Sequence, residues 1–177
     1  MKLVALLLIC IALIGCTSEE EEKPVPEIDL NEINELIASG INEQRTKEGL
    51  EPLKVDLDLY RISLAHSEDM AENDFFDYEN PQGQGPVERA EKAGYNCTRE
   101  YEKAYSKGIA ESIYKANHAK KKLETGEISE YNTEEDIAEM AVESWSENAN
   151  MLSGNYTRVG IGTAKKDLDV YITADFC

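Results

Sequence analysis

The chain has 177 residues, of which 36 are acidic and 18 are basic, so its formal net charge at pH 7 is −18. A protein of this charge is repelled by a polyphosphate backbone, which argues against nucleic acid as a partner. Anionic lipid headgroups repel it as well. Once a short N-terminal leader is removed, about 150 residues remain, which is enough for one globular domain with a full hydrophobic core.

The N-terminal segment has the form of an export signal. Lys2 precedes an apolar run from Leu3 to Ile14, which is too short to cross a bilayer core of roughly 30 Å but fits a secretory signal. The run closes with Leu13-Ile14-Gly15-Cys16, which resembles the lipobox of prokaryotic lipoproteins, where a lipid is attached to the cysteine. We therefore expect a lipoprotein signal at residues 1–15 and lipidation of Cys16. A plain secretory signal that happens to contain Cys16 is the alternative.

Residues 16–27 are expected to form a solvated tether. Glutamates occupy positions 19–22 and repel one another, and Pro24 and Pro26 prevent a helix. Such a spacer after a lipidated cysteine would hold a domain over residues 28–177 away from the membrane. The predicted location is therefore extracytoplasmic, with the membrane lipid at Cys16 as the anchor.

Cysteine usage agrees with export. Cys10 lies in the leader and Cys16 is the lipidation candidate, which leaves Cys97 and Cys177 in the domain. An even pair of thiols in an oxidising compartment predicts a disulfide. A bridge closing a loop of about 80 residues would stabilise the domain by roughly 4 kcal/mol. Two buried free thiols are the alternative.

Four helices are predicted in the first three quarters of the domain. The first begins at Ile28 and ends near Gly49, and the second begins after the N-cap residue Asp56. A short helix follows at Val87–Ala93, and a capping-box-like start at Thr133 opens the last one. The apolar stripe of the second helix consists of Leu59, Ile62, His66 and Met70. We therefore expect His66 to be a hydrogen-bonded core residue.

The C-terminal region changes to a period of two. Val159, Ile161 and Thr163 alternate with glycines, and a second alternating run follows at 168–173, which predicts a β-hairpin. With a strand-like segment at 109–114, the order of elements predicts an α+β fold. Residues 115–132 are expected to form an inserted helix or flap, with His118 as a solvated residue on its basic part.

Several different short motifs follow one another along the chain. They are Ile41–Arg45 with Gly49–Leu53, Leu64–Ala71, Ala110–Ile113, Ala141–Trp145, and Asn150–Leu152 with Asn155–Gly162. This series resembles the CAP superfamily (cysteine-rich secretory, antigen 5 and pathogenesis-related 1 proteins), in particular its short prokaryotic secreted members. The resemblance covers roughly residues 33–177. It implies an α-β-α sandwich, in which helices cover both faces of a central antiparallel sheet.

The resemblance also implies a central cleft, and here the chain departs from the family. CAP domains line this cleft with two histidines and acidic residues that can bind a divalent metal. Tyr78 stands where the first histidine is expected, and Ser146–Ala149 is too short for the second and contains no histidine. The family glutamate remains as Glu111, with Glu147 as a candidate neighbour. We therefore expect no metal and no cofactor at a cleft formed by Tyr78, Glu111 and Glu147.

These observations favour a monomeric, non-catalytic binding module for a lipid, a peptide or a surface protein. A hydrolase-like enzyme with Glu111 as general base is the first alternative. It would require a raised pKa for that carboxyl and an oxyanion site, and the sequence shows neither. A passive envelope component is the second alternative.

Overall fold

The computed structural model describes residues 24–101, 104–147 and 149–177. The predicted signal, the Cys16 anchor and most of the tether lie outside these residues. The helices are α1 (Leu30–Lys47), α2 (Leu57–Asn73), α3 (Pro86–Lys92) and α4 (Glu134–Trp145). The strands are β1 (Lys54–Val55), β2 (Thr98–Tyr101), β3 (Ala104–Lys107), β4 (Ala110–Asn117), β5 (Ala119–Lys122), β6 (Ile128–Tyr131), β7 (Arg158–Lys166) and β8 (Asp169–Phe176). No helix within the described segments is long and apolar enough to cross a membrane.

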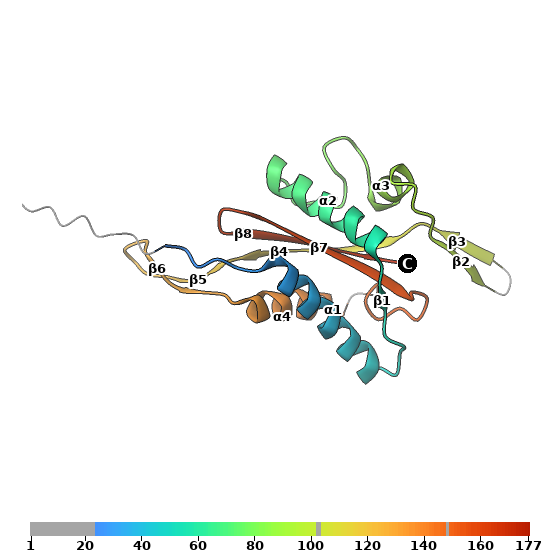
Figure 1. The fold of residues 1–177 in the computed structure, drawn as a ribbon, viewed down its shortest axis with the longest axis horizontal. Helices are drawn as coiled ribbons and strands as arrows, with labels where there is room; N and C mark the ends of the chain where they lie inside the picture. The colour runs from blue at the N-terminus through green and yellow to red at the C-terminus, as the bar shows by residue number, and fades with distance from the viewer. Residues whose placement is uncertain (1–23, 102–103, 148) are drawn as a thin grey trace, which may run out of the picture.

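The predicted α+β sandwich is confirmed (Figure 1). A four-stranded sheet in the order β1-β7-β8-β4 has α2 on one face and α1 with α4 on the other. The sheet is mixed rather than antiparallel, because β1 pairs in parallel with β7. This correction has a topological cause: β1 and β7 are far apart in the sequence, and no hairpin connects them that would require an antiparallel arrangement.

The alternating glycines of β7 set the distance between the sheet and α2. A Cβ at Gly160 or Gly162 would overlap the backbone of α2, so this helix lies directly on the strand. The close approach lets two helix hydroxyls reach the strand. The Ser63 hydroxyl lies 2.9 Å from the Gly160 carbonyl oxygen, and Ser67 donates to the Gly162 carbonyl at 2.8 Å.

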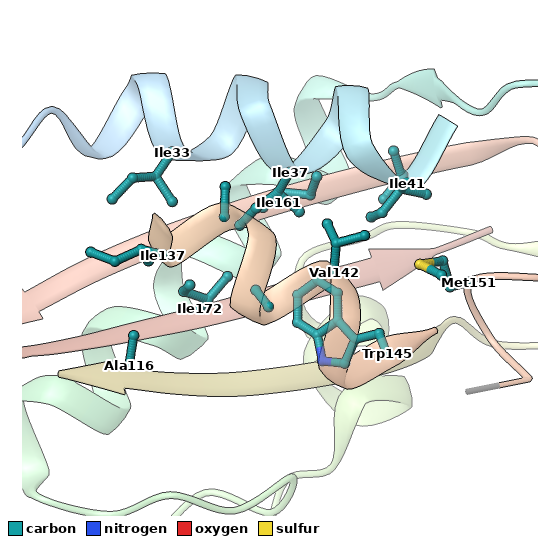
Figure 2. Packing of buried hydrophobic residues seen from close by; sticks show 14 of the residues in the cluster. Ile33, Ile37, Ile41, Ala116, Ile137, Val142, Trp145, Met151, Ile161 and Ile172 are labelled. Carbon is teal, nitrogen blue, oxygen red and sulfur yellow. The ribbon is translucent and has the colours of Figure 1, made fainter. Parts of the chain in front are cut away.

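The main hydrophobic core fills the opposite face of the sheet (Figure 2). The side chains of α1 that enter it recur every fourth residue, as an amphipathic helix requires. Trp145 closes one end of the core and donates its indole N–H to the Ile113 carbonyl at 3.1 Å. The fully buried members include Ile33, Ile37, Ile41, Ile137, Met151 and Ile172. Each such side chain contributes about 1.5–3 kcal/mol by leaving water.

Asn42 and Arg45 give the first sequence motif its structural role. The Asn42 side chain accepts from the Leu53 amide at 2.7 Å and donates to the Leu53 carbonyl at 3.0 Å. Arg45 is only 1% exposed. Its guanidinium donates to the carbonyls of Glu51, Met151, Ser153 and Tyr156. The two side chains therefore fix the loops that lead into β1 and β7.

A disulfide joins Cys97 to Cys177, as the sequence predicted. It ties the last residue of the chain to the segment between α3 and β2. Leu59, Ile62 and Ala90 belong to the same small buried cluster as the two cysteines. The bond therefore links the end of the sheet to the α2–α3 side of the domain.

An expectation about His118 is corrected in the segment 115–132, which forms a flap rather than an inserted helix. This segment contains no helix: β4 ends in it, and the rest forms the β5–β6 hairpin. His118 is 1% exposed rather than solvated, and its ring packs 5.0 Å from the ring of Tyr131. The lysines at 120–122 are exposed, because they lie beyond the bend that turns His118 inward. A run of basic neighbours therefore indicated the wrong environment for this imidazole.

Candidate functional site

The predicted cleft residues do not meet in one pocket. Glu111 lies at the start of β4, beneath α2, and its side chain is fully buried. Tyr78 is 45% exposed in the loop after α2, and its backbone carbonyl accepts a hydrogen bond from Arg89. Glu147 is exposed in the turn after α4. Nearby, Asn150 donates to the Glu111 carbonyl at 2.9 Å.

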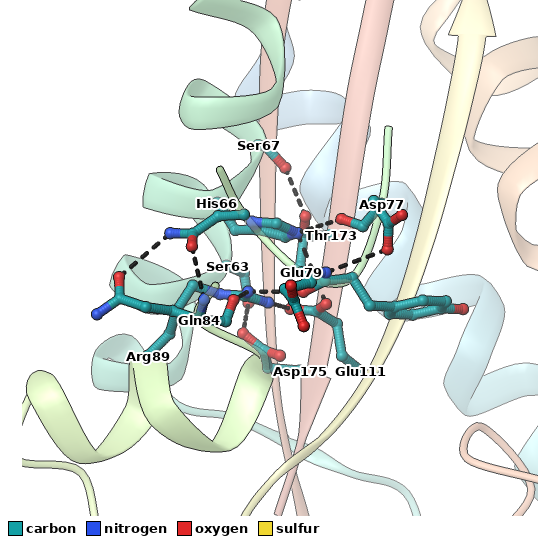
Figure 3. Close-up of polar contacts among 12 residues, drawn as sticks. Ser63, His66, Ser67, Asp77, Glu79, Gln84, Arg89, Glu111, Thr173 and Asp175 are labelled. Carbon is teal, nitrogen blue, oxygen red and sulfur yellow. Dashed lines mark hydrogen bonds and ion pairs between the residues drawn. The ribbon is translucent and has the colours of Figure 1, made fainter. Parts of the chain in front are cut away.

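Arg89 on α3 is the partner of Glu111, and no sequence pattern indicated it. Its Nη2 lies 2.5 Å from Glu111 Oε2, and its Nη1 donates to the carbonyls of Tyr78 and Gln84, each at 2.8 Å. The Arg89 side chain is 9% exposed. One guanidinium therefore joins β4 to the loop that connects α2 with α3 (Figure 3).

Asp175 supplies a second buried carboxyl to the same cluster. It lies directly opposite Glu111 in the antiparallel pairing of β4 and β8 and has no exposed surface. Ser63 donates to its Oδ2 at 2.8 Å. Burial, followed by the charge of Glu111, raises the pKa of Asp175 well above its ordinary value.

The position of the two buried carboxyls beside one guanidinium predicts that the pair holds one proton. Burial raises the pKa of Glu111 too, although Arg89 opposes this. Glu111 Oε1 and Asp175 Oδ1 are both buried and neither has a donor among the described residues. A proton between the two carboxyls would supply that donor, and Arg89 would balance the single remaining charge.

His66 completes the cluster as a neutral imidazole. The ring is fully buried, with Nε2 3.0 Å from the Asp77 carbonyl and 3.7 Å from Glu111 Oε1. Burial, together with the charge of Arg89, lowers the pKa of His66 to about 4. The Nε2 proton is therefore donated to the Asp77 carbonyl. The expectation of a hydrogen-bonded core histidine agrees with this geometry.

These residues do not fit the divalent metal that the CAP resemblance implies. A zinc site needs several imidazole, thiolate or carboxylate donors that converge within about 2 Å of one ion. Glu111 is paired with Arg89, and the Nε2 of His66 points to a backbone carbonyl. The part of the chain that the structure describes contains no group of three or more histidine, cysteine or acidic side chains that could hold an ion.

The side chains of Glu111 and Asp175 expose no surface to a substrate. Glu111 and Asp175 are sealed beneath α2, and a base must come within about 3 Å of its substrate. What the cluster does is hold the loop 77–84 against the sheet. That loop and α3 form one wall of a groove of about 560 Å³, and α2 forms the other. The groove is lined, among others, by Ile62, Ala65, Asn80, Gln84, Arg89 and Tyr95.

Comparison with known proteins identifies the family. The model of the cysteine-rich secretory protein family (CAP) matches residues 38–176. The uncharacterized protein YkwD of Bacillus subtilis is 26% identical over 121 residues, which cover 68% of this chain and 38% of YkwD. The chain thus spans well under half of that relative.

Two solved structures share the fold at low sequence identity. An outer surface protein of Borrelia burgdorferi superposes with a TM-score of 0.60 at 16% identity, over 86% of this chain and 98% of that one. An extracellular SCP-domain protein of Bacillus anthracis gives a TM-score of 0.58 at 19% identity, over 82% of this chain and 40% of that one. The family match extends over most of the sequence, and the chain belongs to the cysteine-rich secretory protein (CAP) family.

Proposed function

We propose that the protein is an extracytoplasmic CAP domain that works by binding a ligand rather than by catalysis, and that a lipid on Cys16 holds it at the membrane. The observation that carries the proposal is the state of Glu111, which is buried, ion-paired with Arg89 and placed against a second carboxyl. The names of the two structural relatives, an extracellular protein and an outer surface protein, support the location.

The groove between α2 and α3 is the binding site that we assign to this function. Its floor is apolar where Ile62 and Ala65 lie, and the side-chain amides of Asn80 and Gln84 line the opposite wall. Lys92 is exposed at its rim. Apolar floors with a few fixed polar groups are typical of small-ligand sites. The charged residues of the lining are Arg61, Arg89 and Lys92 against Asp58 and Asp69. This local excess of cations suits an anionic amphiphile, although the chain as a whole repels anions.

Calorimetric titration of the protein with lysophosphatidylglycerol, below its micelle concentration, tests the groove. Lys92→Glu is expected to weaken binding about tenfold, because it places a negative charge beside the anionic headgroup. Lys47→Glu makes the same charge change on α1, at a different groove, and should leave the affinity unchanged. Equal losses in both variants would show a general charge effect and would count against this site.

The hydrolase alternative requires Glu111 to be freed from Arg89. Titration of chelator-treated protein with zinc, repeated on Glu111→Gln, separates the two functions. We expect no submicromolar zinc binding. Tight binding that Glu111→Gln abolishes would contradict the binding-module proposal and would favour the enzyme.

The anchor has its own test. Cys16→Ser removes the only thiol at the predicted cleavage site, so the protein should leave the detergent phase after phase separation, or remain unprocessed. Unchanged partitioning of a processed variant would exclude lipidation as the anchor. The groove experiments do not depend on this result.

A further inference from the structure

One long edge of the central sheet is only partly covered. β1 pairs with β7 at Arg158 and Val159 alone, through the bonds Lys54 N–H to Thr157 O and Asp56 N–H to Val159 O. After Asp56 the chain turns away into α2. In Figure 1, β1 accordingly meets only one end of β7.

The remaining edge of β7 presents unpaired backbone groups. Arg158 exchanges backbone hydrogen bonds in both directions with Cys177, just beyond the end of β8. Even-numbered residues of β7 therefore direct their backbone N–H and C=O groups toward β8, and odd-numbered residues direct theirs toward the β1 side. Ile161, Thr163 and Lys165 therefore direct their N–H and C=O groups outward. Among the described residues, no backbone group is bonded to them on this side.

Two adjoining hollows follow this edge between α1 and α2. Their volumes are about 250 and 380 Å³, and both are lined by Asn31, Asn34 and Tyr60. Ile161 lines the first hollow, and Thr163 and Lys165 line the second. The space thus lies where a strand that continued β1 along β7 would run.

The α2 wall of this space changes from apolar to acidic. Tyr60 lies beside Gly160 and Leu64 beside Gly162, so helix and strand run in the same direction, each advancing about 6 Å per step. Residues four apart on α2 therefore follow the edge in register. They are Tyr60, Leu64, Glu68 and Glu72. At the mouth of the first hollow, Val55 and Leu57 are 62% and 67% exposed.

We propose that this groove binds an extended peptide segment of a partner protein, which adds as a strand to the free edge of β7. Its main chain would pair with Ile161, Thr163 and Lys165, because an unpaired edge is a template for strand addition. One apolar side chain would lie near Tyr60 and Leu64. A basic side chain farther along would lie near Glu68 and Glu72. This site is separate from the α2–α3 groove, on the other side of α2, and does not depend on it.

The probe is a capped octapeptide that alternates threonine with valine in its first half and threonine with lysine in its second. Two partly N-methylated forms provide a matched pair, since each removes the amide donors of one edge of the peptide. Strand addition predicts that one form loses about tenfold or more in affinity while the other binds nearly as the parent does. Equal losses in both forms, or in neither, would overturn the proposal.

Variants of the protein test each wall of the groove. Glu68→Lys with Glu72→Lys should weaken the lysine-bearing probe by about tenfold and reduce the salt dependence of its binding. Glu139→Lys with Glu143→Lys changes the charge equally on α4 and should not. Thr163→Pro removes one edge donor that β8 does not use and should also weaken binding. Equal effects of the two charge variants would contradict recognition at this wall.

Amide hydrogen exchange tests the same site in the protein without substitutions, so misfolding of a variant cannot affect the result. Saturation with the probe should slow exchange at Ile161, Thr163 and Lys165 by about tenfold or more, while amides of α4 keep their rates. Protection confined to other segments would overturn the proposal. Sedimentation equilibrium would expose a competing occupant: a dimer lost in Thr163→Pro would assign the edge to a second copy of this chain.

Discussion

Replacing Asp175 with asparagine is expected to stabilise the protein at neutral pH, although the residue is completely buried. Asparagine keeps the shape of the side chain and can still accept from Ser63. Its amide can donate to Glu111 Oε1, which has no hydrogen-bond partner among the described residues. The variant therefore satisfies the buried pair without the shared proton, and Glu111 remains neutralised by Arg89.

The size of the effect follows from proton linkage. The pKa values of Glu111 and Asp175 are raised in the folded protein, so above an unfolded pKa of about 4 the native state holds a proton that the unfolded state releases. This proton costs the parent up to about 1.4 kcal/mol of stability for each pH unit until the folded pair ionises. Asp175→Asn removes the cost, so its advantage over the parent should widen as the pH rises.

Urea unfolding, followed by far-UV circular dichroism at pH 4.5, 5.5, 6.5 and 7.5, measures this difference. Asp169→Asn on the same strand is the control. Asp169 pairs with Lys115 at 2.8 Å near the surface, and its pKa is lowered by that hydrogen bond. Its replacement should cost at most about 1 kcal/mol at neutral pH, and the cost should shrink in acid. An advantage of Asp175→Asn that does not grow with pH would refute the shared proton.

Three further predictions concern the rest of the domain. His66→Gln should make the stability of the protein less dependent on pH below pH 6.5. The pKa of His66 falls from 6.5 to about 4 on folding, so the parent loses up to about 1.4 kcal/mol of stability per pH unit as the pH falls through this window. Equal pH profiles of the two proteins in urea unfolding would contradict a neutral buried imidazole. Gly160→Ala should destabilise the protein by about 3 kcal/mol or prevent folding, because its Cβ would overlap the backbone of α2. Gly154→Ala, whose Cβ would meet only a side chain at 3.7 Å, should retain a melting temperature within a few degrees of the parent. Alkylation without reductant should modify neither Cys97 nor Cys177, and two alkylated thiols in the intact mass would show that the bridge is absent. Reduction of the disulfide should lower the free energy of unfolding by about 4 kcal/mol.

The helices and strands could be predicted from the sequence because the residue patterns that indicate them are local. The Asp56 carboxylate caps α2 by accepting from the amides of Asp58 and Leu59, and Thr133 with Asp136 forms the capping box of α4. The alternation of glycines with apolar residues likewise marked β7. Each signal spans a few residues, so it survives without knowledge of the tertiary contacts.

The contacts of the candidate site were harder to predict from the sequence because they depend on the register between strands. Glu111 faces Asp175 only because β4 and β8 pair in one particular alignment, and no local pattern fixes that alignment. Arg89 belongs to a seven-residue helix whose side chains give no sign of their target. The family resemblance directed attention to Glu111, but it could not indicate the guanidinium that pairs with it.

The ion pair with Arg89 explains how the domain can keep Glu111 buried. A buried carboxylate without a partner is strongly destabilising, and the neighbouring Asp175 would make this worse. Arg89 supplies the cation from α3 and at the same time anchors the loop that carries Tyr78. Removing that cation would cost about 3–5 kcal/mol, so catalysis by a free Glu111 would require the domain to give up a large part of its stability. Binding on the outer side of Arg89 requires no such loss, and this difference favours the binding module over the enzyme.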